Sequence, residues 1–102
     1  MNVDLSFAAT VWKHAGPSGW YFVTVPQGLS RRVRETNKLS ESGWGRLHVA
    51  AVINGHRWST AMWFDTKHRS YLVPIKADVR RKTKIDAGSK VVVNIMICDL
   101  AP

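Results

Sequence analysis

The sequence is poor in cysteine, in acidic residues and in long apolar runs. Cys98 is the only cysteine, so an internal disulfide is excluded and a reducing compartment fits. Charged residues or glycine interrupt the apolar stretches every few positions, which excludes a membrane-spanning helix. The start, Met1 to Asp4, lacks the basic and apolar segments of a signal peptide. These features predict a soluble cytoplasmic protein.

The residues that support catalysis or metal binding are scattered. The four histidines have no His-x3-His spacing, and one cysteine cannot form a zinc knuckle. Cys98 has no histidine near it in sequence to activate its thiol. The sequence also has no glycine-rich phosphate loop, and most acidic side chains fall on predicted loops or short helices. We therefore predict a non-enzymatic protein with no catalytic residue, metal ligand or cofactor.

Alternating apolar residues predict β-strands in a single domain spanning 1–102. Residues 5–11 alternate, residues 16–19 form a turn cluster, and residues 20–25 are aromatic and β-branched, so we expect a hairpin of these two strands. A second hairpin is predicted around Asn54-Gly55, the preferred pair for a type I′ turn. Its expected register pairs Ile53 with His56, Ala51 with Trp58, Val49 with Thr60 and His48 with Ala61.

Two segments share one order of features: strand, proline, short basic helix, glycine, strand. Pro26 and Pro74 are 48 positions apart, as are Arg32 and Arg80. Helices are expected between Pro26 and Asn37 and over 77–84, and the last strand over 91–97. The half-repeats, approximately 20–53 and 70–98, predict an internal pseudo-twofold duplication that closes one barrel.

Several motifs together resemble a known family. They are Phe7-x-Ala9, Gly19-Trp20-x-Phe22-Val23-x-Val25-Pro26, Gly43-Trp44-Gly45-x3-Val49 and Tyr71-Leu72-Val73-Pro74-Ile75-Lys76-Ala77-x-Val79-Arg80. Their order and spacing are similar to those of the domain-of-unknown-function family 1905. The resemblance implies a mainly β fold, a small double-split β-barrel of about six strands with two short helices. The AbrB-like proteins build this architecture from two chains, so a monomer could complete it here, and a weak homodimer remains an alternative.

The basic residues outnumber the acidic ones, fifteen to seven, which leaves a net charge of +8. Such a balance favours an anionic partner, with nucleic acid foremost and an acidic protein as the alternative. Many of these charges fall on the two predicted helices, and they are Arg31, Arg32, Arg34, Arg80, Arg81, Lys82 and Lys84. Two matched patches could straddle a duplex. The alternative interpretation is that these residues form solvated helix faces on which Arg32 and Arg80 pack their aliphatic stems.

Two other functions remain open. A small-molecule-binding barrel would use Trp20, Tyr71, Lys76 and Arg80, provided that these residues converge on one pocket. A protein-interaction or immunity-type module would bind an acidic partner. Aromatic residues are numerous, and the odd spacing between Trp58 and Trp63 places their side chains on opposite faces of one strand.

Overall fold

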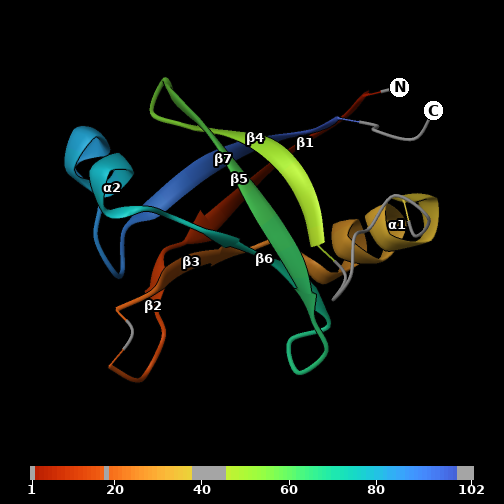
Figure 1. Cartoon of the computed structure of the whole chain (residues 1–102), viewed down its shortest axis with the longest axis horizontal. Coiled ribbons are helices and arrows are strands. Elements are labelled where there is room, and N and C mark those ends of the chain that lie inside the picture. Colours follow the sequence, from red (N-terminus) through yellow and green to blue (C-terminus); the bar gives the residue numbers. More distant parts are fainter. Residues whose placement is uncertain (1, 18, 38–45, 99–102) are drawn as a thin grey trace.

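The computed structural model describes residues 2–17, 19–37 and 46–98. These residues form seven strands and two helices, mainly β as the sequence predicts. The strands curl into a barrel-like sheet, and the helices lie at opposite ends of its long dimension (Figure 1). The elements are β1 (Asn2–Thr10), β2 (Trp12–Lys13), β3 (Tyr21–Thr24), α1 (Gln27–Asn37), β4 (Arg46–Ile53), β5 (His56–Asp65), β6 (Ser70–Pro74), α2 (Ala77–Thr83) and β7 (Lys90–Cys98).

The seven strands form one antiparallel sheet in the order β1-β7-β4-β5-β6-β3-β2. Exchanging β1 with β5, β3 with β6 and β4 with β7 reproduces the neighbouring pairs of these six strands, with one exception. The pair β5–β6 would correspond to a pair β1–β3. Those two strands contact each other, although no ladder joins them among the described residues. β1 and β5 belong to the exchange although they lie outside the predicted half-repeats 20–53 and 70–98. The arrangement is therefore pseudo-twofold.

The local centre of this exchange lies where β3 meets β6. Thr24 pairs with Leu72, and these residues are 48 positions apart, as Pro26 and Pro74 are. The prolines that end both strands thus occupy equivalent places, and each is followed by a helix. Proline cannot donate to the ladder, which explains why the chain leaves the sheet there.

The central hairpin confirms the predicted register. Ile53 pairs with His56, Ala51 with Trp58, Val49 with Thr60 and His48 with Ala61. Asn54 and Gly55 have φ angles of 50° and 77°. Both positive angles are what a type I′ turn requires, and glycine adopts its angle without steric cost.

The prediction for the first hairpin is largely wrong. β1 pairs along its whole length with β7, and only Trp12 and Lys13 of β2 pair with β3. The chain changes partners at Val11, whose N–H donates to the carbonyl of Ser89 and whose carbonyl accepts from the N–H of Gly88. The alternation of apolar residues identifies a strand and its buried face but not the strand that pairs with it. β7 offers β1 a longer apolar partner than β3 does.

The interior is filled by the inward-facing residues of all the long strands. β4 contributes Leu47 and Ile53, and β7 contributes Ile95 and Ile97, all of them buried. Ser30 of α1 is a buried polar residue that joins this helix to β6 and to the segment after β3. Its hydroxyl donates to the carbonyl of Val25 over 3.1 Å and accepts the N–H of Tyr71 over 3.1 Å. These bonds fix α1 against the strands that carry the candidate site.

Candidate functional site

A second apolar cluster lies on the outer face of β3 and β6. Val23 and Val73 point into the core and are fully buried, so Phe22 and Leu72 must point to the opposite side. Phe22 and Leu72 are nevertheless only 5% exposed, because other side chains cover them on that outer face. A sheet face turned away from the core carries such a cluster only at a cost in solubility, which makes it a candidate for ligand binding.

The cover consists of aromatic rings. Trp12 lies 5.0 Å from Phe22 between ring centroids, and Trp20 stacks on Phe22 at 5.9 Å with 9° between the planes. Trp63 of β5 meets Phe22 edge to face at 5.4 Å and Trp20 at 6.0 Å. Each such pair adds about 0.5–1.5 kcal/mol to simple burial. Trp20 stays 49% exposed, so this edge of the cluster is open to solvent.

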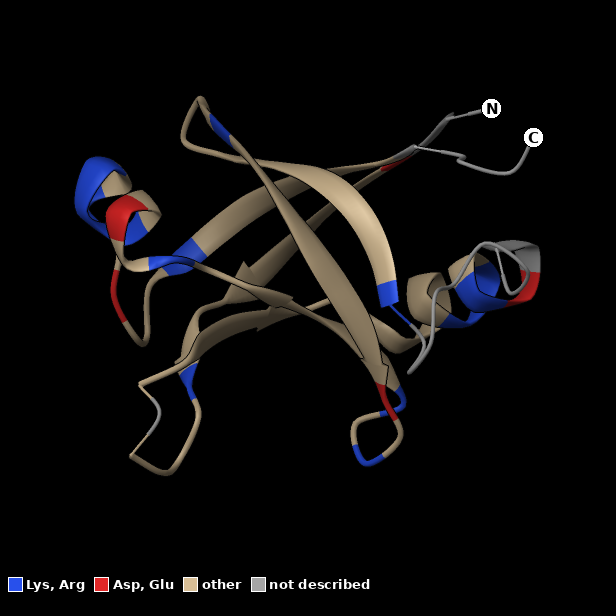
Figure 2. Ribbon diagram, viewed as in Figure 1, with Lys and Arg blue, Asp and Glu red and all other residues tan. Residues whose placement is uncertain are grey.

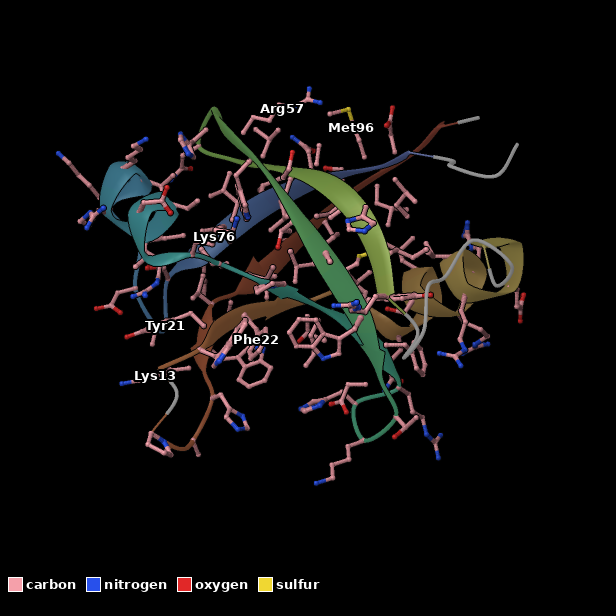
Figure 3. The ribbon with its side chains drawn as sticks, viewed as in Figure 1. Lys13, Tyr21, Phe22, Arg57, Lys76 and Met96 are labelled. Atoms are coloured by element: carbon pink, nitrogen blue, oxygen red, sulfur yellow. The ribbon has the colours of Figure 1, made fainter. Side chains whose placement is uncertain are left out.

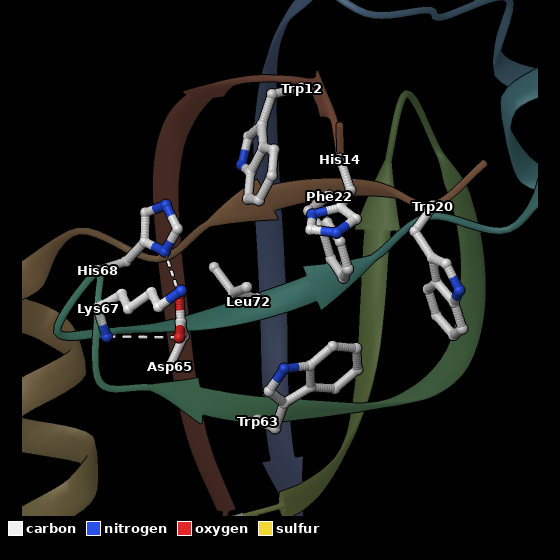
Figure 4. A pocket seen from close by; sticks show the side chains of 9 residues that line it. All are labelled: Trp12, His14, Trp20, Phe22, Trp63, Asp65, Lys67, His68 and Leu72. Carbon is white, nitrogen blue, oxygen red and sulfur yellow. Dashed lines mark hydrogen bonds and ion pairs between the residues drawn. The ribbon is translucent and has the colours of Figure 1, made fainter. Parts of the chain in front are cut away.

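These rings line a pocket of about 570 Å³, which we call the aromatic pocket. Figure 4 shows the side chains converging from β2, β3, β5, β6 and the loop after β5. The volume lies within the range of small-ligand sites, roughly 300–1,000 Å³. The lining residues are Trp12, His14, Trp20, Phe22, Trp63, Asp65, Lys67, His68 and Leu72.

One end of the aromatic pocket is polar. His68 Nδ1 and Asp65 Oδ2 form a short contact, and the ring of His68 stacks on Trp12 at 5.5 Å (Figure 4). The hydrogen bond with His68 is the largest cause that lowers the pKa of Asp65 below its ordinary value. The carboxylate is therefore ionised at neutral pH. The carboxylate suits a hydrogen-bond donor, and the cationic Lys67 also lines the pocket.

Hydrogen bonds hold the loop after β5 in place. The carbonyl of His68 accepts the Gln27 side-chain amide over 3.1 Å and the Ser70 hydroxyl over 3.1 Å. Across the pocket, the indole N–H of Trp12 donates to Thr24 Oγ1 over 2.9 Å. Arg69 adopts a left-handed φ of 52°, which turns the chain back into β6. The pocket is thus preformed by contacts from both halves of the molecule.

A smaller depression, the Lys76 depression, adjoins the aromatic pocket. It holds about 300 Å³, and Trp20 forms a wall of both. Three of the four residues predicted for a small-ligand pocket, Trp20, Lys76 and Arg80, line it. The fourth, Tyr71, lies in the core with no exposed surface and cannot contact a ligand there. Its position in β6 faces inward because Leu72 faces outward.

A third depression, the Arg57 depression, continues from the second. It holds about 540 Å³ on the outer face of β4 and β5, and Lys76 is a wall of both depressions. Its cationic side chains are Arg57 and Lys76, and His48 also lines it, opposite Ala61. Ala50, Ser59 and Ala61 form its low floor. Lys76 Nζ donates to the carbonyl of Ser59 over 3.5 Å.

The basic helices do not form one surface. Figure 2 shows their Lys and Arg residues at the two ends of the molecule, which extends 37 Å along this axis. Arg32 is exposed and does not occupy a packed position like that of Arg80. The arginine of α1 that packs is Arg34, with Cζ 4.1 Å from the centroid of the Phe64 ring. Arg31, Arg81, Lys82 and Lys84 are exposed.

Sequence reasoning missed the residues of the aromatic pocket other than Trp20. The prediction that Trp58 and Trp63 lie on opposite faces of one strand is confirmed, because Trp58 is buried in the core and Trp63 contacts Phe22 on the outer face. The even spacing of Trp20 and Phe22 indicates a shared face and could have identified them as a pair. Trp12 and His68 carry no such signal, because β2–β3 pairing and the loop after β5 bring them to the pocket.

Several predictions concern residues that fall outside the described part of the chain. These are the Gly43-Trp44-Gly45 motif and the side chain of Cys98. Among the described residues, no three His, Cys, Asp or Glu side chains gather as metal ligands would. None of the described helices is long and apolar enough to cross a bilayer.

The chain belongs to the family described as Domain of unknown function (DUF1905), whose family model matches residues 7–95. The match confirms the resemblance that the ordered motifs indicate. The relation to AbrB-like proteins remains a prediction. No curated protein matches the chain.

Proposed function

We propose that this protein is a non-enzymatic binding module for an anionic ligand that carries planar rings, with nucleic acid the foremost case. The observation that carries the proposal is the aromatic pocket on the outer face, open at Trp20 and adjoining the cationic Lys76 depression. Aromatic platforms next to positive charge are how proteins hold unpaired bases and their phosphates. A stacked base contributes about 1–3 kcal/mol, roughly a 5- to 150-fold change in affinity.

The charge of the whole molecule supports the same ligand class. A net charge of +8 attracts polyanions over the range of the screened field, about 10 Å in 0.1 M salt. Arg81 and Lys82 of α2 are exposed on the same short helix as Arg80, which lines the Lys76 depression. The charge attracts a polyanion to the molecule, and the rings hold it at the aromatic pocket.

The first test is fluorescence anisotropy with labelled single-stranded and duplex DNA and RNA at about 50 and 200 mM salt. We expect binding that weakens with salt. The combined variant Arg80→Ala, Arg81→Ala, Lys82→Ala should lose most of it, and Trp20→Ala should weaken it at least fivefold. Val92→Ala is the matched control, because Val92 is also a large exposed apolar residue but lies on β7. Absence of binding to every nucleic acid at low salt contradicts the proposal.

The second candidate is a small-molecule-binding protein. The volume of the aromatic pocket favours it, since about 570 Å³ accommodates a compact ring system. Two results together would favour this candidate. Free planar heterocycles would quench the tryptophan fluorescence of the wild type but not of Trp63→Ala, and the protein would bind no oligonucleotide. Polyglutamate serves as the probe for the alternative acidic-protein partner.

A further inference from the structure

The three depressions adjoin one another through shared wall residues. Trp20 separates the aromatic pocket from the Lys76 depression, and Lys76 separates that depression from the Arg57 depression. In Figure 3 Lys76 lies between Arg57 and Tyr21, on the side of the molecule where α2 lies. A ligand that leaves the aromatic pocket past Trp20 therefore passes Lys76 and reaches Arg57. We call this path the outer track.

Charge along the outer track is one-sided. Among the described residues that line the Lys76 and Arg57 depressions, the charged ones are Arg57, Lys76 and Arg80, and none is acidic. The acidic residue of the aromatic pocket, Asp65, lines neither of the other two depressions. The aromatic pocket carries charges of both signs, Asp65 and Lys67, whereas the other two depressions carry only positive charge. The phosphates of a ligand are therefore attracted toward Lys76 and Arg57, while a ring occupies the aromatic pocket.

The floor of the track lets an extended chain approach the sheet. Ala50, Ser59 and Ala61 are small, and they lie between the cations of one side and the tryptophans of the other. Arg80 presents its guanidinium from above the Tyr21 ring, and its Nε is buried without a hydrogen-bond partner among the described residues. A phosphate that enters the Lys76 depression would meet this guanidinium.

Resting on the proposed function, we propose that the ligand is a single strand of nucleic acid that follows the outer track. One base stacks in the aromatic pocket, and the phosphates that follow it contact Arg80, Lys76 and Arg57. A duplex does not fit this arrangement, because its bases are stacked inside and cannot enter a pocket on a sheet face. An acidic peptide without aromatic side chains, such as polyglutamate, would satisfy the cations but leave the aromatic pocket without a planar ring.

The test compares oligothymidylates of one, two, four and eight nucleotides by anisotropy or tryptophan quenching, with a duplex of equal length as competitor. We expect affinity to rise up to about four nucleotides, the lower end of site sizes on comparable small sheets. Three phosphate contacts predict a slope of log K against log salt of about −2 for the octamer. The duplex should compete at least tenfold less well.

Arg57→Ala should reduce this slope by about 0.7 and weaken the octamer without changing the binding of the mononucleotide. Arg31→Ala removes the same charge from α1, at the far end of the molecule, and should leave the slope unchanged. If a mononucleotide binds as tightly as the octamer, the proposed binding along the outer track is wrong, but the proposed function still stands. Equal competition by the duplex or by polyglutamate also overturns the track. If none of the oligonucleotides binds, both the outer track and the proposed function are wrong.

Discussion

The guanidinium of Arg80 lies over the ring of Tyr21, with 3.7 Å between Cζ and the ring centroid. This contact joins α2 to β3, two elements that are far apart in the chain but meet because β3 pairs with β6. The face of the guanidinium packs on the Tyr21 ring, and Arg80 also lines the Lys76 depression. Arg80 is therefore both a structural residue and a proposed ligand contact, and a lysine cannot replace it in both roles.

A double-mutant cycle measures the Arg80–Tyr21 contact. We expect Arg80→Ala and Tyr21→Leu each to lower the free energy of unfolding, with a coupling of about 0.5–2 kcal/mol because a partly desolvated cation faces the ring. Urea unfolding of the four proteins gives the coupling. Arg81→Ala with Tyr21→Leu is the control pair, since Arg81 is exposed on the same helix. If the changes in the free energy of unfolding are additive in both cycles, the Arg80–Tyr21 contact does not contribute to stability.

The two stacked rings of the aromatic pocket differ in structural importance. Phe22 is 5% exposed and packed among three aromatic side chains, so Phe22→Ala should cost about 3 kcal/mol through the cavity that it leaves. Trp20 is 49% exposed, and Trp20→Ala should cost less than about 1 kcal/mol. Denaturant unfolding checks both values. A large loss for Trp20→Ala would show that this ring supports the fold and that its ligand test needs a milder variant such as Trp20→Phe.

Ser30 provides a test of the junction between α1 and the sheet. Ser30→Ala removes the acceptor of the Tyr71 N–H and the donor to the Val25 carbonyl in a fully buried position. The expected cost is about 1–3 kcal/mol. Ser59→Ala, on the exposed face of β5, should change the free energy of unfolding by no more than about 0.5 kcal/mol. Thermal or urea unfolding distinguishes them, and equal effects would contradict the assigned role of the buried hydroxyl.

The pair of Asp65 and His68 predicts a pH dependence of stability. The pKa of Asp65 is lower in the folded protein than in the unfolded chain, mainly because of its hydrogen bond with His68. Its stabilising effect is therefore present above the unfolded pKa of about 4 and is lost as the pH falls through the lower folded pKa. At pH 6, Asp65→Asn should lower the free energy of unfolding by less than about 1 kcal/mol, because the pair is partly exposed.

The measurement is urea unfolding of the wild type and Asp65→Asn between pH 2.5 and pH 6, a range of roughly two units around the unfolded pKa. The difference between the two proteins should shrink as the pH falls below about 4, since the protonated carboxyl then resembles the amide. Asp86→Asn, at an exposed turn before β7, is the control for general charge effects. A difference that stays constant across this range would contradict the assigned role of the His68 contact.

Patterns that are local in the chain were sufficient for most elements of the fold. The Asn54-Gly55 pair set both the turn and the register of β4 and β5, because only a few residue types adopt two successive positive φ angles. Pro26 and Pro74 marked the two exits from the sheet, and alternation assigned Val91 to Ile97 to a strand with a buried face. The ordered motifs also identified the family.

The partners of the strands were decided only by the tertiary structure. Alternation in β1 does not distinguish β3 from β7 as its neighbour, since both present β-branched residues, and the choice depends on how the whole sheet curls. The same reason hides the candidate site. Trp12 is distant in the chain from Trp63 and His68, and Tyr71 carries the same chemistry as a pocket residue but faces the core. The sequence alone thus determined which residues are in strands, while long-range packing determined which of them meet on the outer face.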